Sequence, residues 1–369
     1  MNLLSLVSYN FLPAKMGGQK NVALHNAYLS KHVNLVCVAT SLNDTKVATY
    51  KVYNILNESP FRYINIFYFF TIRRIIKEEK ITHLLLEHPY YGWLGFLLKY
   101  FCKVKLIIHS HNIESMRFRT LHKWWWKVLG YYEKWVHQQA DFSLFITEED
   151  KFYAERFYKI NSSKTAVITY GIEFYKIPTK DEKQKAKAFI RMKHQINEDE
   201  KLILFNGTLN YKPNIAAIEI ILQHINTFLQ KQQNFKYKIL ICGKDLPEKF
   251  NQLTNEPNII YCGLVDDISK YFKAADIFIN PVVDGGGIKT KVVEALAFNT
   301  TVISTQSGAI GIPMEMVNDK LLIINDGDWD AFSRLIIETN SSIQTSDLFY
   351  KHFYWGNIAE KTYQILQQT

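Results

Sequence analysis

Short apolar segments with the pattern of β-strands alternate with helical patterns along almost the whole chain. This alternation is typical of parallel α/β domains, in which a helix returns the chain to the start of the next strand. We predict strands at 3–8, 34–39, 83–87, 105–109, 142–146, 165–169, 202–206, 238–242, 258–261, 277–280, 301–304 and 321–324. We predict helices near 19–31, 67–79, 90–102, 120–139, 148–158, 213–231, 266–274, 288–298 and 328–340, with a helical tail near 357–367. The fold class is therefore α/β.

The chain has 369 residues, which exceeds what one hydrophobic core usually serves, so we expect two domains. The alternation stops after residue 169, where a polar, charged segment containing Pro178 follows. We place a linker at 171–185, an N-terminal Rossmann-like domain at 1–170 and a C-terminal one at 186–369, whose last helix could pack back on the N-terminal domain. Two doubly wound domains of this kind would face each other across a ligand cleft at the carboxyl ends of their strands.

Charge and composition limit the kinds of partner that we expect for this protein. Lys and Arg total 44 against 35 Asp and Glu, a formal net charge of +9, which favours phosphates, an anionic membrane surface or nucleic acid. The four cysteines lie in or beside apolar runs without metal-ligand spacing, which indicates buried free thiols in a reducing compartment. No apolar run approaches the ~20 residues that a membrane-spanning helix needs, and the N-terminal residues have the pattern of a strand. We expect a cytoplasmic protein, or one peripheral on the cytosolic face of the inner membrane.

One segment predicts a phosphate site. The strand at 277–280 leads into three consecutive glycines, and a helix is predicted directly after them. Glycines let backbone N–H groups approach a ligand, and the first turn of a helix carries unpaired N–H groups with partial positive charge. Lysines in that turn oppose the helix dipole unless an anion is present. The residues of this predicted site are Gly285, Gly286, Gly287, Ile288, Lys289 and Lys291.

A carboxylate in the next turn suggests what the phosphates belong to. Glu294 precedes an apolar run and is expected to accept hydrogen bonds from the vicinal ribose hydroxyls of a nucleotide. A pyrophosphate beside a ribose indicates a sugar-nucleotide site. The alternatives are that the glycines form only a turn and that Glu294 serves a structural ion pair.

Further glycines and a lysine follow other strands. Lys212 precedes Pro213, which suits a first helical turn, and is either a phosphate contact or a surface lysine. The glycines at strand ends, which fit a close approach to donor phosphate or acceptor but also ordinary turns, are Gly17, Gly18, Gly207 and Gly243.

These segments together resemble a known family. The second half contains FNGTLNYKPN (205–214), ILICGKD (239–245), YCGLVDDISKYFKAADIFINPVVDGGGIKTKVVEALA (261–297) and VISTQSGAIGI (302–312). The first half contains HSHNIES (109–115) and ITYGIE (168–173). The chain is similar to family 4-like glycosyltransferases of the GT-B fold (glycosyl transferases group 1), in the branch with a G-x-G-I-K-x-K-x-x-E motif.

The resemblance implies transfer of a sugar from a nucleotide-sugar donor with retained anomeric configuration, without a cofactor or bound metal. It implies that His111 lies near the donor sugar and that Lys289 and Glu294 hold the donor, so these three are the predicted catalytic residues. The sequence departs from the family where relatives have a first glutamate, since Gly286 stands there, and Thr208 replaces a usual arginine.

Two short patterns suggest metal binding. His109 and His111 lie two apart at a strand end and could share a face, but the sequence shows no third ligand for them. The Asp326-Gly327-Asp328 triplet precedes a predicted helix, where aspartate is a good N-cap. We therefore predict no metal site.

The segment 117–137, RFRTLHKWWWKVLGYYEKWVH, combines aromatic and basic residues. Trp and Tyr favour the membrane interface, and basic residues favour anionic headgroups. Because successive helical residues are 100° apart, Trp124, Trp125 and Trp126 cannot all face one core. We predict contact with an anionic membrane, with a core helix as the alternative and single-stranded nucleic acid as a distant one.

We therefore predict a retaining hexosyltransferase that moves sugar from a UDP- or GDP-sugar to a glycan or lipid-linked glycan in cell-surface polysaccharide synthesis. The donor would bind the C-terminal domain and the acceptor the N-terminal domain, and we expect no nucleic-acid partner. The alternatives are a catalytically inactive nucleotide-sugar-binding or membrane scaffold protein, and a UDP-sugar 2-epimerase.

Overall fold

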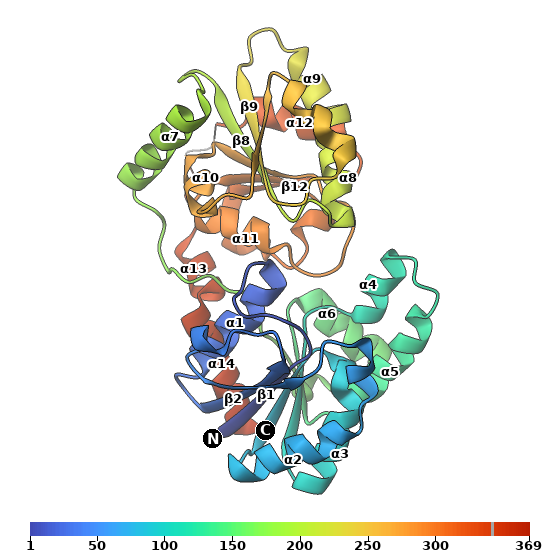
Figure 1. Cartoon of the computed structure of the whole chain (residues 1–369). Coiled ribbons are helices and arrows are strands. Elements are labelled where there is room, and N and C mark those ends of the chain that lie inside the picture. Colours follow the sequence, from blue (N-terminus) through green and yellow to red (C-terminus); the bar gives the residue numbers. More distant parts are fainter. Residues whose placement is uncertain (341–342) are drawn as a thin grey trace. The chain divides into compact units, whose positions relative to one another are not determined.

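The structure, a computed structural model, describes residues 1–340 and 343–369, without the side chains at 252, 254 and 255. The chain forms two compact units (Figure 1). The first unit comprises Met1–Glu173 with His352–Thr369, and the second comprises Phe174–Lys351. Each is built on a parallel sheet with helices on its faces, as the α/β prediction requires.

The first unit contains a seven-stranded sheet of order β3-β2-β1-β4-β5-β6-β7, in which every neighbouring pair is parallel. Its strands are β1 (Asn2–Val7), β2 (Asn34–Thr40), β3 (Lys51–Leu56), β4 (His83–Glu87), β5 (Lys105–Ser110), β6 (Phe142–Phe145) and β7 (Thr165–Val167). The strand order reverses between β1 and β4, which makes this pair the switch point of the sheet. The sequence prediction omits β3, an edge strand whose residues are mostly half-exposed and lack a continuous apolar run.

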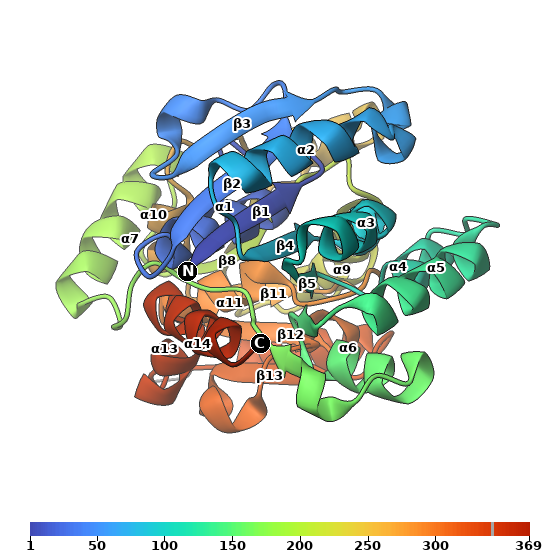
Figure 2. The ribbon, with the colours of Figure 1, turned by 90° about the horizontal axis from the view of Figure 1, so that it is seen from below.

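Helices cover both faces of this sheet. They are α1 (Gly17–Leu29), α2 (Phe67–Glu78), α3 (Gly92–Cys102), α4 (Glu114–Thr120), α5 (Trp126–Gln139), α6 (Glu148–Tyr153), and the C-terminal α14 (Trp355–Gln368). Alternate strand residues such as Leu4, Leu84 and Leu106 share one core with α2, α3 and α5. Figure 2 shows these helices along the strands of the first sheet. The helix predicted over 120–139 is α5 and begins only at Trp126, because the chain turns at 121–125, where His122 has a φ of 54°, and the preceding helix α4 was not predicted.

The C-terminal helix belongs to the first unit. His25 Nε2 on α1 lies 3.1 Å from Thr362 Oγ1 on α14, and both residues are buried. Trp355, at the start of α14, is fully buried against Gly171, where an added Cβ would lie 2.4 Å from Trp355 Cδ2. The C-terminal residues therefore close the face of the sheet opposite α2 and α3.

The second unit contains a six-stranded parallel sheet of order β10-β9-β8-β11-β12-β13. Its strands are β8 (Lys201–Asn206), β9 (Tyr237–Cys242), β10 (Ile259–Gly263), β11 (Ile277–Asn280), β12 (Thr301–Thr305) and β13 (Leu321–Ile324). The order reverses between β8 and β11. All twelve strands predicted for the chain are confirmed within one or two residues at most ends.

The helices of the second unit are α7 (Lys180–His194), α8 (Lys212–Ile220), α9 (Thr227–Gln230), α10 (Ile268–Ala274), α11 (Thr290–Ala297), α12 (Trp329–Glu338) and α13, whose range is Asp347–Phe353 and whose end enters the first unit. Part of the linker prediction is wrong, because α7 begins inside 171–185. Thr179 and Glu182 form a capping box there, a start signal that the polar composition concealed. Asp328 caps α12 by accepting from Ala331 N–H, as predicted.

The four cysteines are free thiols; Cys37 and Cys242 are buried, as predicted, whereas Cys102 and Cys262 are half-buried. Among the described residues, no helix is both long enough and apolar enough to span a membrane.

Candidate functional site

The glycine-rich loop connects β11 to α11 at the carboxyl edge of the second sheet. Gly285 has a φ of +92° and Gly287 a φ of +68°, values that L side chains rarely adopt. Gly286 between them is exposed, whereas Gly285 is half-buried and Gly287 is buried, so the loop presents its backbone to solvent at Gly286. The helix begins at Thr290, two residues later than predicted, which leaves Ile288 in the loop and Lys289 at the N-cap position.

The segment that connects β8 to α8 lies beside this loop. An added Cβ on Gly285 would lie 3.5 Å from Pro213 Cγ and 3.6 Å from Tyr211 Oη. Tyr211 and Pro213 flank Lys212, the exposed first residue of α8. The structure thus brings the predicted phosphate residues of 207–213 and 285–289 together at the β8–β11 switch point, where α/β sheets bind ligands.

Two further glycines permit the close approach of backbone at this edge. Gly207 N–H donates to the carbonyl of Cys242 at 3.1 Å, and Gly243 has a φ of +152°. A Cβ on Gly243 would lie 1.9 Å from the Gly207 carbonyl oxygen. Gly243 is therefore required for backbone packing, which accounts for it without any ligand contact.

The two lysines of the loop differ in their surroundings. Lys289 Nζ donates to the carbonyls of Gly285 at 3.0 Å and Gly287 at 2.9 Å, so its ammonium closes the loop on itself. Lys291 donates to Asn214 Oδ1 at 3.0 Å and lies over the ring of Phe205. Burial, and then the charge of Lys289, lower the pKa of Lys291 to about 7. A cation beside the glycines is therefore Lys289, while Lys291 links α11 to α8.

Glu294 lies in the second turn of α11 and is half-buried. Its neighbours Val292, Val293 and Ala295 are buried against the sheet, which fixes the helix that carries the carboxylate. The predicted donor-binding residues Gly207, Lys212, Gly285 to Lys289 and Glu294 thus share one edge of one unit.

The other predicted residues lie in the first unit. Gly17 and Gly18 begin α1 directly after the loop that follows β1, beside the switch point of that sheet. An added Cβ on Gly18 would meet nothing within 4 Å, so the chain itself does not require glycine there. His111 follows β5 and is 8% exposed.

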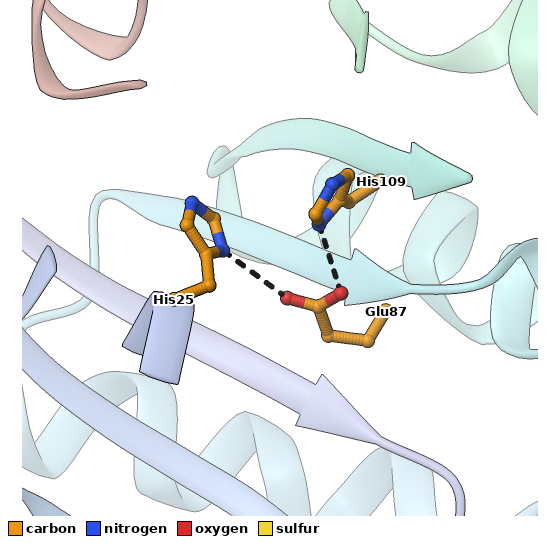
Figure 3. Close-up of side chains that lie close together, drawn as sticks. All are labelled: His25, Glu87 and His109. Atoms are coloured by element: carbon orange, nitrogen blue, oxygen red, sulfur yellow. Dashed lines mark hydrogen bonds and ion pairs between the residues drawn. The ribbon is translucent and has the colours of Figure 1, made fainter. Parts of the chain in front are cut away.

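His111 belongs to a buried polar cluster centred on Glu87. Glu87 ends β4 directly beside His109 on β5, in register across the parallel pair. Its Oε2 accepts from His109 Nδ1 at 2.9 Å and from His111 Nε2 at 2.7 Å, while Oε1 lies 3.8 Å from His25 Nδ1 (Figure 3). Burial raises the pKa of Glu87, but the nearby histidines outweigh it, and the pKa falls well below its usual range.

Burial determines the charge of the His111 ring. Desolvation, reinforced by His88, lowers the pKa of His111 to about 3, so the ring is neutral. The ring of His88 lies 4.2 Å from that of His111, and Asn21 Nδ2 lies 3.5 Å from His111 Nδ1. A neutral ring fixed by Glu87 can donate a hydrogen bond at a defined angle, but it cannot supply a positive charge.

The inference from sequence that the His109/His111 pair lacks a third candidate ligand is wrong. Glu87 and His25 supply ligand atoms beside His109, and one such atom from each of the three residues lies within 4.8 Å of the others. The signal available in the sequence was a glutamate at the end of the apolar run 84–86. His25 could not be found this way, because it comes from a helix 62 positions earlier in the chain than Glu87.

The aromatic residues of 117–137 differ in their exposure. Trp124 is 86% exposed and Tyr131 is 78% exposed. Trp125 packs on Phe118 with ring centroids 4.5 Å apart, and Arg119 lies over Trp126. One Trp of the three therefore presents most of its ring to solvent.

Comparisons with known proteins agree with this architecture. Residues 200–341 match the family described as "Glycosyl transferases group 1", and residues 23–174 match "Glycosyltransferase Family 4". The two matches fall in different units and, with the fold, support a glycosyltransferase of the family 4 type.

Two curated relatives were found. Alpha-monoglucosyldiacylglycerol synthase from Streptococcus pneumoniae is 28% identical over 154 residues, which span 40% of this chain and 33% of the relative. An uncharacterised glycosyltransferase from Methanocaldococcus jannaschii is 22% identical over 298 residues, or 74% of this chain and 72% of the relative. The match to the pneumococcal protein thus covers a third of its length.

Solved structures share the whole fold. A glycosyltransferase from Rickettsia africae has a TM-score of 0.74 at 15% identity and covers 100% of this chain and 99% of its own. HepE from Anabaena, crystallised with UDP-glucose, has a TM-score of 0.73 at 14% identity and covers 100% of both chains. The chain therefore has the GT-B fold of two Rossmann-like domains.

Proposed function

We propose that this protein is a retaining glycosyltransferase that takes a sugar from a UDP- or GDP-sugar. The observation that carries the proposal is the glycine loop of 285–287 beside Tyr211 and Pro213, which flank Lys212, at the switch point of the second sheet. The exposed backbone at Gly286 suits a pyrophosphate, and Glu294 lies in the second turn of the helix that follows, where it could bind the ribose. HepE, which has the same fold, was crystallised with UDP-glucose.

Catalysis in this proposal consists mainly of stabilising the departing nucleoside diphosphate. Negative charge grows on its β-phosphate as the anomeric bond breaks, and amides and cations that are already in place meet that charge without reorganising. Lys289 is held at the loop by carbonyl oxygens, so it is positioned before the donor binds. We propose no bound metal at the phosphates, no cofactor and no protein nucleophile, and we keep His111 as the residue near the donor sugar.

The acceptor is proposed to be a glycan or lipid-linked glycan bound by the first unit, in cell-surface polysaccharide synthesis. The partial likeness to a monoglucosyldiacylglycerol synthase supports an acceptor carried on a lipid. A protein of this kind would work from the cytoplasm at the inner face of the membrane.

The test of donor binding is a thermal-shift panel of UDP- and GDP-sugars followed by calorimetry on Glu294→Gln. The substitution keeps the shape but removes charge-assisted hydrogen bonds, which contribute ~1.5–3 kcal/mol. Affinity for the nucleoside diphosphate should fall about tenfold or more, because ~1.4 kcal/mol is a factor of ten. Glu338→Gln, an exposed carboxylate on α12, is the matched control. Unchanged affinity would reject Glu294 as the ribose ligand.

The test of reaction type is an incubation with labelled donor and a membrane lipid extract. Transfer of the sugar with retention of its anomeric configuration, determined by NMR of the product, supports the proposal. Binding without transfer would instead identify a catalytically inactive nucleotide-sugar-binding protein. This alternative is suggested by Gly286, which stands where relatives have a glutamate. An isomerised donor would identify an epimerase.

Membrane contact is proposed through the exposed aromatics of the first unit. The main candidates are Trp124 and Tyr131, and the first unit also exposes Phe67, Phe70 and Phe101. Vesicles with anionic lipid should sediment the protein better than neutral vesicles, and 1 M salt, with a Debye length of ~3 Å, should release it. The double substitution Trp124→Ser, Tyr131→Ser should weaken sedimentation, whereas Leu264→Ser in the second unit, 76% exposed, should not. Equal binding by all three proteins would reject this surface.

A further inference from the structure

His88, the residue that follows β4, has a backbone conformation that side chains rarely permit. Its φ of 76° and ψ of 154° fall in a region that is essentially restricted to glycine. Lys103, Lys159 and Gln195 also have positive φ, but their ψ values of 34°, 42° and 49° place them in the commoner left-handed helical region. Strain of the kind found at His88 persists only where the surrounding structure enforces it, and it is typical of functional sites.

The surroundings of His88 do enforce this conformation. Pro89 disfavours the helical region for the residue before it, which keeps the ψ of His88 extended. The N–H of His88 donates to the carbonyl of His109 on the neighbouring strand β5 at 3.0 Å. The backbone of His88 is therefore fixed at the β1–β4 switch point, which is where parallel α/β sheets bind ligands.

The ring of His88 is packed among other rings but keeps one nitrogen accessible. Its centroid lies 4.2 Å from that of His111, 5.5 Å from that of Tyr90 and 5.7 Å from that of Tyr9. Nδ1 is fully buried, 3.3 Å from Glu114 Oε1 but without the geometry of a hydrogen bond. Among the described residues no hydrogen bond reaches Nε2 either. Unlike Nδ1, however, Nε2 is not fully buried, so the 8% of His88 that is exposed includes this nitrogen.

The charges around His88 favour a neutral ligand. Glu114 is fully buried, and its Oε2 accepts from Tyr90 Oη at 2.8 Å and from Arg117 Nη1 at 2.9 Å. Burial raises the pKa of Glu114, but its contacts outweigh burial and lower the pKa to about 2, and Glu87 is ionised as well. Two carboxylates beside the ring disfavour an anion such as phosphate. A hydroxyl group both donates and accepts, so it can bond to Nε2 whether or not that nitrogen carries a proton.

We propose that His88 binds a hydroxyl group of the sugar acceptor, with the half-buried rings of Tyr9 and Tyr90 beside it. Aromatic side chains with a few fixed polar groups are typical of sites for small ligands. Tyr9 Oη donates to the carbonyl of Gly18 at 3.3 Å, and an added Cβ on Gly18 would meet nothing within 4 Å, so there is open space beside Tyr9. The assignment rests on the proposed glycosyltransferase function, but its residues all belong to the first unit.

Two conservative substitutions separate the two nitrogens of the ring. The amide of His88→Asn takes the place of Nδ1 beside Glu114, whereas the amide of His88→Gln reaches the place of Nε2. If His88 binds the acceptor, His88→Gln should retain the function that His88→Asn loses. A role only in holding Glu114 predicts the opposite order. His122→Asn is the matched control, because His122 is an exposed histidine of the same unit with a positive φ of 54°.

The variants are compared by transfer of labelled sugar to a membrane lipid extract, by hydrolysis of the donor and by calorimetry with UDP and GDP. At limiting extract, His88→Asn should transfer about tenfold less, as the loss of one hydrogen bond predicts, with hydrolysis and nucleotide affinity unchanged. Transfer by His88→Asn at the parent's rate, or an equal loss of hydrolysis and affinity, overturns the assignment. A parent that binds neither nucleotide rejects the proposed function instead.

A second measurement uses the parent alone, so it does not depend on the folding of a variant. Diethyl pyrocarbonate modifies accessible imidazole nitrogens, and mass spectrometry locates the modified histidines. His88 should be modified in the free protein, and octyl glucoside or the lipid extract should slow this modification, while His122 should react equally with and without them. An unreactive His88 would show that Nε2 is not accessible, and modification that neither additive slows would show that no sugar binds there. Either result overturns the proposal.

Discussion

The glycine loop of the second unit and the Glu87 cluster of the first lie at comparable places, each at the carboxyl edge of a parallel sheet. The loop presents backbone, with Gly286 exposed and a lysine held by carbonyl oxygens. The cluster consists of side chains that are nearly removed from water. A site that must admit a charged ligand and release it can depend on exposed amides, whereas a buried carboxylate needs permanent partners. The comparison therefore supports the proposed ligand binding at the loop and favours structural positioning by the cluster.

The largest expected effect is on stability, from Glu87→Ala. The change leaves the buried donors of His109 and His111 without their acceptor, and removing one partner of a buried charged network costs ~3–5 kcal/mol. Urea denaturation should show a loss of this size in the first unit. Glu78→Ala, which breaks an exposed pair with Arg74, should cost ~0–1 kcal/mol. Nucleotide binding by the folded fraction should persist. Equal stability of the two variants would show that the cluster does not hold the first unit together.

Alanine substitutions of glycines at the two sheet edges should differ almost as much in their effect on stability. A Cβ on Gly243 would meet the backbone oxygen of Gly207 at 1.9 Å, and its φ of +152° is unfavourable for any L side chain. Gly243→Ala should cost ~1–3 kcal/mol for the backbone conformation and a similar amount for the overlap. Gly18→Ala meets open space inside a helix and should be neutral or stabilising by up to ~1 kcal/mol. Calorimetric melting measures both, and a Gly243→Ala protein that melts like the parent would contradict the crowding at this edge.

The sequence allowed the sheets and the glycine loop to be predicted because their signals are local. A buried strand reads as an apolar run, and the loop's glycines are consecutive, so both are visible within about ten residues. The edge strand β3 escaped because half-exposed residues such as Lys51 and Asn54 interrupt its pattern. The start of α7 was not predicted because its capping residues lie in a charged segment whose composition is typical of a linker.

The Glu87 cluster could not be predicted because its members meet only after the sheet has formed. Glu87 and His109 become neighbours through strand register, and His25 joins them from a helix that is itself held by Thr362 of the C-terminal helix. None of these separations appears in a sequence pattern. The same holds for Lys291, which the motif places beside a phosphate but the structure turns toward Asn214.

The smallest expected effect concerns Lys291, a half-buried lysine of the second unit. The pKa of Lys291 is about 7 when folded, against an ordinary value of 10.5. Between these values the unfolded chain binds more protons than the folded chain, so stability should rise with pH across that window. Lys291→Met should flatten the rise between pH 7 and 9 in urea denaturation, whereas Lys231→Met, an exposed control, should leave it unchanged. If the free energy of unfolding of the parent and of Lys291→Met changes equally with pH, Lys291 is charged in the folded protein. The glycine-loop site would then contain two cations, Lys289 and Lys291, as the motif alone implied.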